Sequence, residues 1–175
     1  IMAACGLDRK KRGILPQNTI VATVMSNLGL HMFAQEYGLN LECTDVGDRN
    51  VLEKMLERGY ALGGEQSGHM IFRDYATTGD GQLTALQVLA LLKESGKKAS
   101  EVFGTCARYP QVLINVPVAD NDVKKAVMAN PALWDAVKAE EEKLAGSGRI
   151  LVRPSGTEAL MRVMVEAKTE EAAQQ

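Results

Sequence analysis

Short runs of β-branched and apolar residues alternate with helical patterns between residues 19 and 95, and this alternation constrains the fold more than any other feature. Strands are predicted at 19–25, 39–43 and 60–62, and helices at 30–37, 49–58 and 83–92. Strands that alternate with helices are typical of βαβ units. This part of the chain is therefore predicted to be an α/β domain with a mixed or largely parallel sheet.

The pattern changes near residue 105, where we predict a boundary between two domains. The second part is predicted to contain strands near 112–118, 149–152 and 160–167 and a helix that begins at Asn130 and Pro131. Pro117 has no amide N–H to donate, so its strand is predicted to end there or to lie at a sheet edge. Residues 1–104 are thus assigned to the α/β domain and residues 105–175 to a smaller α+β domain.

Two local patterns give further expectations. Residues 77–81 supply turn and cap chemistry for helix 83–92, which is so apolar that we expect it to be buried on more than one side. Along strand 160–167, every second residue from Met161 to Ala167 is apolar, which leaves Arg162 and Glu166 on the other face. Core packing is therefore not what requires an arginine at position 162.

Charge and cysteine content exclude several classes of protein. Twenty Lys and Arg against twenty-two Asp and Glu give a net charge of -2, without the basic excess that nucleic-acid and membrane-surface binders use. The three cysteines, Cys5, Cys43 and Cys106, fit neither a disulfide framework nor a Cys-x-x-Cys metal site. No apolar run approaches the roughly 18 residues of a membrane span, and no secretory signal is visible. A reducing, cytoplasmic setting is expected.

Both ends of the chain suggest a piece of a longer protein. Residues 1–5 already follow a helical pattern without a start signal, and Thr169 caps a helix that has only six residues left. We therefore expect further domains upstream of Ile1.

The loop between the last two predicted strands has the residue types of a phosphate site. Arg153 offers a planar fork of donors, and Ser155 and Thr157 offer hydroxyls. Gly156 lacks a Cβ, so successive backbone N–H groups can converge on an anion. Arg162 could add a second cation from the following strand. The alternative is an ordinary surface turn in which Glu158 neutralises Arg153 as a weak ion pair.

A second polar loop, Gly64–His69, follows a predicted strand at the sheet edge where open α/β sheets bind ligands. Glu65 and Ser67 could hold vicinal sugar hydroxyls, because a carboxylate accepts two hydrogen bonds and a hydroxyl both donates and accepts. His69 titrates near neutrality and could move a proton. The alternative is a plain solvated connection.

The segment Val46–Arg49 precedes a predicted helix. Asp48 is expected to cap that helix, and Arg49 faces either an anion or solvent.

Taken together, these segments resemble a known family. Gly64–His69 (GEQSGH), Thr77–Gly81 (TTGDG) and Arg153–Glu158 (RPSGTE) are similar, in this order, to motifs of the α-D-phosphohexomutases, and the resemblance covers essentially the whole chain. Thr23–Gly29 and Val46–Arg49 resemble the amino-sugar branch of that family. Its members interconvert glucosamine 6-phosphate and glucosamine 1-phosphate through a bisphosphate, on the route to UDP-N-acetylglucosamine and the cell wall.

The resemblance implies an α/β third domain and an α+β fourth domain similar to the TATA-box-binding protein. It implies that Glu65 and Ser67, with Arg49 as a weaker candidate, bind the sugar, and that His69 is a candidate proton carrier. The residues expected to hold the phosphate that is not transferred are Arg153, Ser155, Gly156, Thr157 and Arg162. Ala159 departs from the family, which usually has proline there, so the exit of the loop is less rigid.

The phosphoserine and the Mg²⁺ loop of this family belong to its first two domains. We therefore expect no metal ligand in this chain, Mg²⁺ ligands outside it, glucosamine 1,6-bisphosphate as the intermediate, and no activity of the chain alone. The expected partners are a small phosphosugar and the upstream domains of the same protein, with a homodimer also possible and no nucleic acid or membrane. The alternatives are a mutase of glucose or mannose phosphates, a non-catalytic phosphosugar-binding module, and a structural assembly piece.

Overall fold

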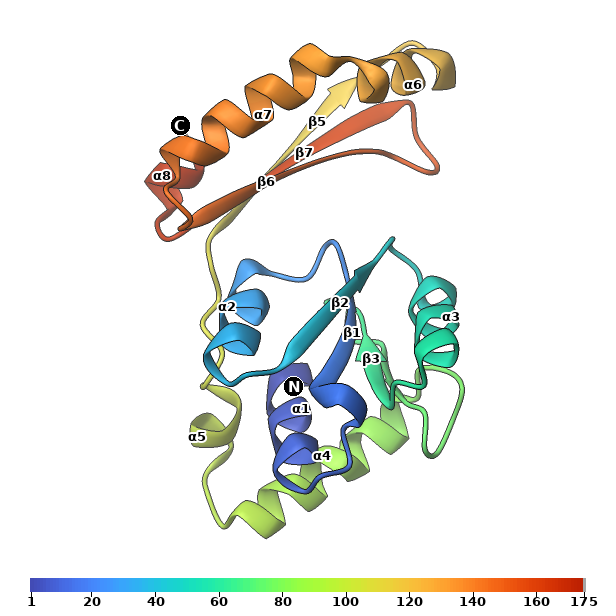
Figure 1. Cartoon of the computed structure of the whole chain (residues 1–175), viewed down its shortest axis with the longest axis vertical. Helices are drawn as coiled ribbons and strands as arrows, with labels where there is room; N and C mark the ends of the chain where they lie inside the picture. The colour runs from blue at the N-terminus through green and yellow to red at the C-terminus, as the bar shows by residue number, and fades with distance from the viewer. Residues whose placement is uncertain (175) are drawn as a thin grey trace. The chain divides into compact units, whose positions relative to one another are not determined.

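The computed structural model describes residues 1–174, which form two compact units, one from Ile1 to Arg108 and one that begins at Tyr109 (Figure 1). The elements of the first unit are α1 (Met2–Lys11), the short helix η1 (Pro16–Asn18), β1 (Thr19–Thr23), α2 (Leu28–Glu36), β2 (Asn40–Thr44), α3 (Asp48–Arg58), β3 (Leu62–Gly64), β4 (Met70–Phe72), α4 (Gly81–Ser95) and α5 (Ala99–Phe103). Those of the second are β5 (Gln111–Pro117), α6 (Asn121–Ala129), α7 (Pro131–Lys143), β6 (Gly148–Pro154), β7 (Leu160–Ala167) and α8 (Glu170–Gln174). None of the described helices is long and apolar enough to cross a membrane.

The first unit is built on a four-stranded sheet in the order β2-β1-β3-β4. β1 pairs in parallel with β2 and with β3, whereas β3 and β4 form an antiparallel hairpin. The α/β fold with a mixed sheet is thus confirmed. The sequence prediction did not include strand β4, and it placed the third strand at 60–62, whereas β3 spans Leu62–Gly64, because runs of three residues are too short to show a period or a boundary.

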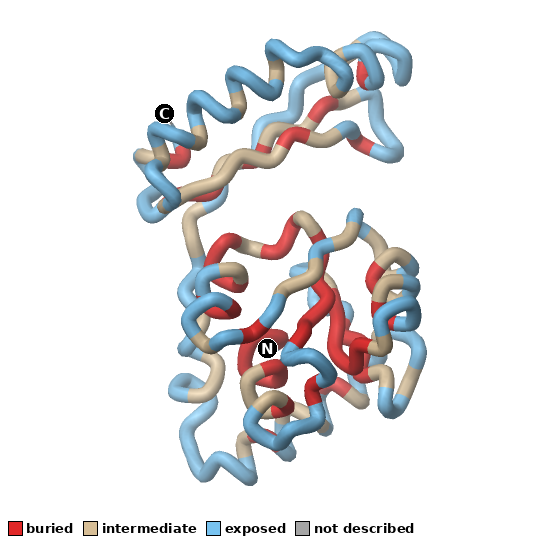
Figure 2. Tube along the Cα trace, in the orientation of Figure 1, coloured by how far each residue is buried: buried red, intermediate tan, exposed pale blue. Residues whose placement is uncertain are grey.

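Helices cover both faces of this sheet, as Figure 1 shows for α2 and α3. Ile20 and Ala22 of β1 belong to a core cluster with residues of α1, α2 and α4, and Val21 between them packs with Val51 and Met55 of α3. All of β1 is buried, as the red tube in Figure 2 indicates. A continuous apolar strand is what burial on both faces requires.

Local signals placed most helix ends correctly. Gly38, at φ +61°, follows helix α2 in the left-handed conformation that glycine adopts without strain. Asp80 caps α4 by accepting hydrogen bonds from the N–H groups of Gln82 and Leu83 at 2.8 and 2.9 Å. Asn130 caps α7, whose first residue is Pro131. These signals depend on neighbouring residues alone, so they can be read without the tertiary fold.

The prediction that the apolar helix α4 is buried on more than one side is wrong. Leu91 and Thr84 are buried, but Leu86 and Leu89 are 64% and 60% exposed. The helix lies on one face of the sheet, so only one stripe of it can reach the core.

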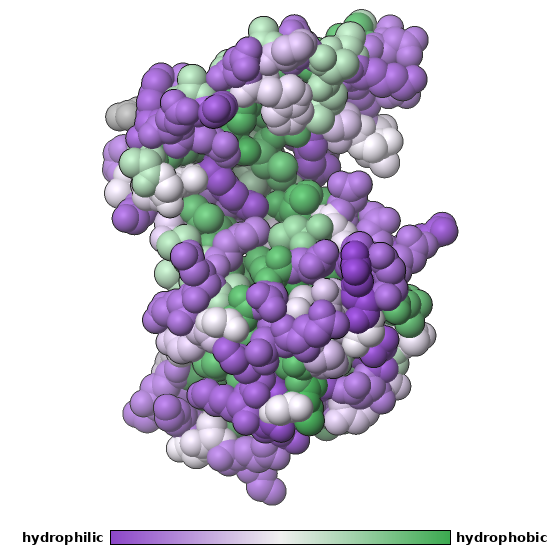
Figure 3. Space-filling view, viewed as in Figure 1, coloured by the Kyte–Doolittle hydropathy of each residue, from purple (hydrophilic) through white to green (hydrophobic). Residues whose placement is uncertain are grey.

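Hydrophilic side chains cover most of the face of the first unit that Figure 3 shows.

The second unit has a three-stranded antiparallel sheet in the order β5-β7-β6. Pro117 ends β5, which is an edge strand as predicted. The alternation along β7 is confirmed as well, because Arg162 pairs in register with Arg153 and Glu166 with Arg149, on the face opposite to Met161. Helix α6 was not predicted from the sequence, although Asp120 caps it by accepting from the N–H groups of Asp122 and Val123.

Candidate functional site

The loop Gly64–His69 is the turn of the β3–β4 hairpin, at the carboxyl end of β3. Its ends are joined by a 2.9 Å hydrogen bond from the N–H of Glu65 to the carbonyl of His69, and Gly68 has φ +106°. Because β1, β2 and β3 are parallel, the loops that follow them share one edge of the sheet. The segment Val46–Arg49 comes from that same edge, after β2.

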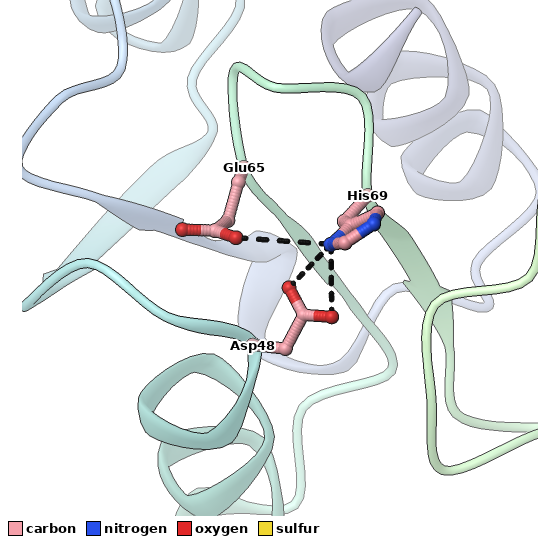
Figure 4. A group of neighbouring side chains, drawn as sticks. All are labelled: Asp48, Glu65 and His69. Atoms are coloured by element: carbon pink, nitrogen blue, oxygen red, sulfur yellow. Dashed lines mark hydrogen bonds and ion pairs between the residues drawn. The ribbon is translucent and has the colours of Figure 1, made fainter.

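Three side chains from these loops lie together (Figure 4). Asp48, the first residue of α3, has both carboxylate oxygens 2.9 Å from Nδ1 of His69. Glu65 accepts a 2.9 Å hydrogen bond from the N–H of Gly47, and its other oxygen lies 3.9 Å from Nδ1 of His69. The contact with Asp48 occupies Nδ1 of His69, so Nε2 is the ring nitrogen that is available to an external group.

The expectation that Asp48 caps its helix is wrong. The cap position is Gly47, at φ +126°, and no side chain bonds to the free N–H groups there. The carboxylate turns instead to His69, a residue 21 positions away that the sequence pattern could not place beside it. Asp48 therefore supports the ring of His69.

The surroundings of Glu65 change the pKa of its carboxyl group. Burial, and then the neighbouring Asp48 carboxyl group, raise the pKa of Glu65, while the hydrogen bond from Gly47 acts in the opposite direction. A carboxyl group with a raised pKa keeps its proton to higher pH, so Glu65 is better able than an ordinary glutamate to donate as well as accept a hydrogen bond.

The motif Thr77–Gly81 closes the same site. A Cβ added at Gly79 would lie 3.4 Å from Cβ of His69 and 3.7 Å from an oxygen of Asp48. Position 79 therefore lies directly beside the side chains of His69 and Asp48. The structure thus brings three separate sequence motifs of the first unit to one place.

Asp48, Glu65 and His69 are also the group of described residues whose ligand atoms could hold a cation, because these atoms lie within 4.8 Å of one another. They do not suit Mg²⁺, which prefers an octahedron of oxygens, whereas one of the three ligands is an imidazole already bonded to Asp48. We derive no step through a metal at this site.

Two other predicted sugar-binding residues stand outside this group. The side chain of Arg49 is 88% exposed and pairs with Glu53 at 2.8 Å, one turn along the same helix. Ser67 is exposed at the tip of the hairpin loop. Both could reach a ligand, and among the described hydrogen bonds and ion pairs neither side chain is joined to Asp48 or His69.

The loop Arg153–Glu158 connects β6 and β7 in the second unit. Arg153 and Arg162 are register partners on the two strands, so two guanidinium groups share one face of the sheet. Burial, and then the charge of Arg162, lower the pKa of Arg153. The Nε atoms of both arginines are buried and have no hydrogen-bond partner among the described residues. Paired cations with unused donors are suited to an anion.

The ion pair considered between Glu158 and Arg153 is not formed. Glu158 instead pairs with Arg162 at 2.5 Å. The two residues are only four positions apart, on either side of the point where β7 begins. One carboxylate thus partly balances two arginines, and the site keeps a positive charge.

Within the loop, Ser155 differs from its neighbours. It is buried, and its hydroxyl oxygen accepts a 3.2 Å hydrogen bond from the N–H of Glu158, so its side chain shapes the turn. Gly156 and Thr157 are exposed, and their N–H groups have no acceptor among the residues that the structure describes. The loop therefore presents free backbone donors.

Sequence reasoning missed Lys124 of helix α6. This lysine is only 7% exposed, and its Nζ donates to the carbonyl oxygens of Ser155 and Glu158 at 2.8 and 2.5 Å. The adjacent Lys125 is exposed and pairs with Asp122. No local signal separates the two lysines, because their difference depends on which side of α6 faces the loop.

Comparisons with known proteins agree with the motifs. The family model for phosphoglucomutase/phosphomannomutase, alpha/beta/alpha domain III, matches residues 1–109, and the model for the C-terminal domain of the same family matches residues 113–175. The chain is 55% identical over 168 residues to the phosphoglucosamine mutase of Caldicellulosiruptor saccharolyticus, a match that covers 96% of this chain and 37% of that relative. It is 53% identical over 171 residues to the phosphoglucosamine mutase of Lactiplantibacillus plantarum, covering 98% of this chain and 37% of the relative.

Solved structures share the fold. The N-acetylphosphoglucosamine mutase of Aspergillus fumigatus in complex with GlcNAc-6P and magnesium aligns with a TM-score of 0.78 at 20% identity, over 99% of this chain and 40% of that one. A phosphoglucomutase/phosphomannomutase family protein from Burkholderia thailandensis aligns with a TM-score of 0.67 at 20% identity, over 99% and 39% of the two chains. The chain thus spans well under half the length of the proteins that it matches.

Proposed function

The chain belongs to the phosphoglucomutase/phosphomannomutase family, and from this premise we propose that it is the substrate-binding half of a phosphoglucosamine mutase. The reaction proposed for the longer protein interconverts glucosamine 6-phosphate and glucosamine 1-phosphate, for UDP-N-acetylglucosamine and cell-wall precursor synthesis. The amino-sugar branch is favoured over a glucose or mannose mutase because relatives at 53–56% identity carry the name phosphoglucosamine mutase.

One observation carries the proposal. Arg153 and Arg162 face each other across two strands with buried, unpartnered Nε–H groups, beside a loop whose Gly156 and Thr157 N–H groups are free among the described residues. A phosphate has enough oxygens to accept from a guanidinium and from backbone amides at once. This arrangement supports a role for residues 105–175 as the phosphate-binding domain.

Residues 1–104 are proposed to bind the sugar. Glu65 is held by Gly47 and has a raised pKa, so it suits a hydroxyl that both donates and accepts. Ser67 and Arg49 are exposed where they could add contacts. His69 is the proposed proton carrier, with Nδ1 held by Asp48 and Nε2 available to a reacting hydroxyl.

The sugar must bind in two orientations, because the phosphate that is held in one half-reaction is transferred in the other. Contacts that read only hydroxyls and a phosphate can serve both orientations. The side chains of Glu65 and Ser67 and the loop Arg153–Glu158 can make the same hydroxyl and phosphate contacts in both orientations, without contacts to other groups of the sugar ring.

The nucleophile and the metal are proposed to lie in further domains. The Aspergillus fumigatus relative was solved with magnesium, and a single-residue variant of that relative was solved with glucose 1,6-bisphosphate. By analogy we propose Mg²⁺ as the cofactor and glucosamine 1,6-bisphosphate as the intermediate. When bound, the metal supplies charge stabilisation for phosphoryl transfer. The upstream domains are the proposed partners, a homodimer is a further possibility, and the three free cysteines suit the proposed cytoplasmic setting.

The proposal predicts that the chain binds glucosamine 6-phosphate through Arg153. In an amide NMR titration, the signals of Ser155, Gly156 and Thr157 should shift with a Kd of about 1 mM. Arg153→Ala should weaken binding by about tenfold or more, because a charge-assisted hydrogen bond contributes about 1.5–3 kcal/mol.

The control is Arg58→Ala, which removes an exposed arginine of α3 and should leave the Kd unchanged. Glucose 6-phosphate and mannose 6-phosphate, titrated in parallel, test the sugar class. Spectra that stay unchanged at tens of millimolar ligand would exclude the phosphate assignment.

A further inference from the structure

We propose that Lys124 is the positioning residue of the phosphate loop: its buried ammonium holds two carbonyl groups inward, so that the amides of the same peptide units face the phosphate. The inference rests on the proposed function, because it takes Arg153–Glu158 to be a phosphate site.

Lys124 is bound to both ends of the turn. Its Nζ donates to the carbonyl of Ser155 at 2.8 Å and to that of Glu158 at 2.5 Å, from a helix that lies 31 residues earlier in the chain. An ammonium group is costly to bury unless acceptors replace its water. Here the acceptors are backbone carbonyls, so the position of the lysine and the path of the loop are fixed together.

The geometry of the peptide bond determines what this does to the amides. In a trans peptide the C=O of one residue and the N–H of the next point in opposite directions, and the described chain has no cis peptide. When the carbonyls of Ser155 and Glu158 turn toward Lys124, the N–H groups of Gly156 and Ala159 must point away from it. No described residue accepts from either group, nor from the N–H of Thr157.

The charges act in the same direction. Carbonyl oxygens would repel a phosphate if they faced it, and Lys124 keeps two of them turned away. Its charge adds to those of Arg153 and Arg162, against the single carboxylate of Glu158 that pairs with Arg162. Lys124 therefore lies on the carbonyl side of the loop, and the N–H groups of Gly156 and Ala159 on the other side are left for the phosphate.

Two neighbouring lysines allow a matched test. The chain is labelled with ¹⁵N and titrated with inorganic phosphate while the amide signals of Gly156, Thr157 and Ala159 are followed, well below the unfolding temperature. Lys124→Met should weaken phosphate binding by about tenfold and shift these three signals in the absence of ligand. Lys125→Met, which removes the same charge from an exposed position, should leave both unchanged.

The outcomes separate the two proposals. If Lys124→Met lowers the unfolding temperature but binds phosphate as tightly as the parent chain, the lysine has a structural role only and the inference is wrong. If Lys124→Met fails to fold, Lys124→Gln replaces it, because glutamine keeps an N–H donor without the charge. Lys124→Gln should bind phosphate with an affinity between that expected of Lys124→Met and that of the parent chain. An affinity equal to that of the parent chain overturns the inference. A parent chain that does not bind phosphate would instead overturn the proposed function.

Discussion

At the scale of single residues, the two candidate sites are each organised by a side chain that contacts no ligand in our proposal. Asp48 holds the ring of His69 in the first unit, and Lys124 holds the turn Ser155–Glu158 in the second. Both use a charge to fix a group that must be oriented. Residues that bind substrate are therefore only part of what these sites require.

The contact between Asp48 and His69 predicts the tautomer of the histidine. The chain has two histidines, His31 and His69. Labelling with ¹⁵N-histidine therefore gives two sets of ring signals, of which one belongs to His69. In its neutral form, the ring of His69 should carry its proton on Nδ1, because the Asp48 carboxylate accepts from that nitrogen.

Asp48→Ala should raise the fraction of His69 that carries its proton on Nε2, as measured by long-range ¹H–¹⁵N correlation, because the remaining carboxylate near Nδ1, that of Glu65, lies 3.9 Å away. Asp45→Ala removes an exposed carboxylate three residues earlier and serves as the control. Identical His69 spectra in both variants would mean that the carboxylate of Asp48 does not orient the ring.

At the scale of elements, most helix termini carry a local sequence signal, with the start of α3 as an exception, whereas the burial of helix faces does not follow from local sequence. Asp80, Asp120 and Asn130 each cap a helix through hydrogen bonds that span two or three residues. By contrast, α4 is apolar on the side that contains Leu86 and Leu89, yet that side is exposed. Composition alone cannot say which stripe of an apolar helix meets the sheet.

This difference predicts unequal effects of two leucine substitutions in α4. Leu91→Ala should reduce the free energy of unfolding by about 2–5 kcal/mol, because it leaves a cavity in the core cluster that contains Leu91. Leu89→Ala should change it by no more than about 0.5 kcal/mol, because that side chain is 60% exposed. Urea unfolding measures both values. Equal losses would show that the Leu89 side of α4 is packed.

At the scale of the whole molecule, the chain combines two units whose proposed tasks are complementary. The first offers hydroxyl-binding groups and a histidine, and the second offers cations and free amides for a phosphate. In our proposal the phosphoserine and the Mg²⁺ site lie in further domains, and the described cluster of Asp48, Glu65 and His69 does not suit Mg²⁺.

We therefore expect the chain alone to bind phosphosugar without turning it over. Incubation with glucosamine 6-phosphate, glucosamine 1,6-bisphosphate and Mg²⁺ should give no glucosamine 1-phosphate above the blank, as followed by ³¹P NMR, while the amide shifts of the loop show binding. Metal-dependent turnover by this chain would place the nucleophile within residues 1–175 and contradict the division of tasks.

The sequence by itself determined the order and type of most elements, the caps of α4 and α7 and the edge position of Pro117, because these depend on residues close together in the chain. The tertiary structure alone decided that Asp48 meets His69, and that Lys124 rather than Lys125 reaches the loop Arg153–Glu158. These contacts follow from how strands and helices pack, and a side chain gives no local sign of which distant neighbour that packing will bring to it.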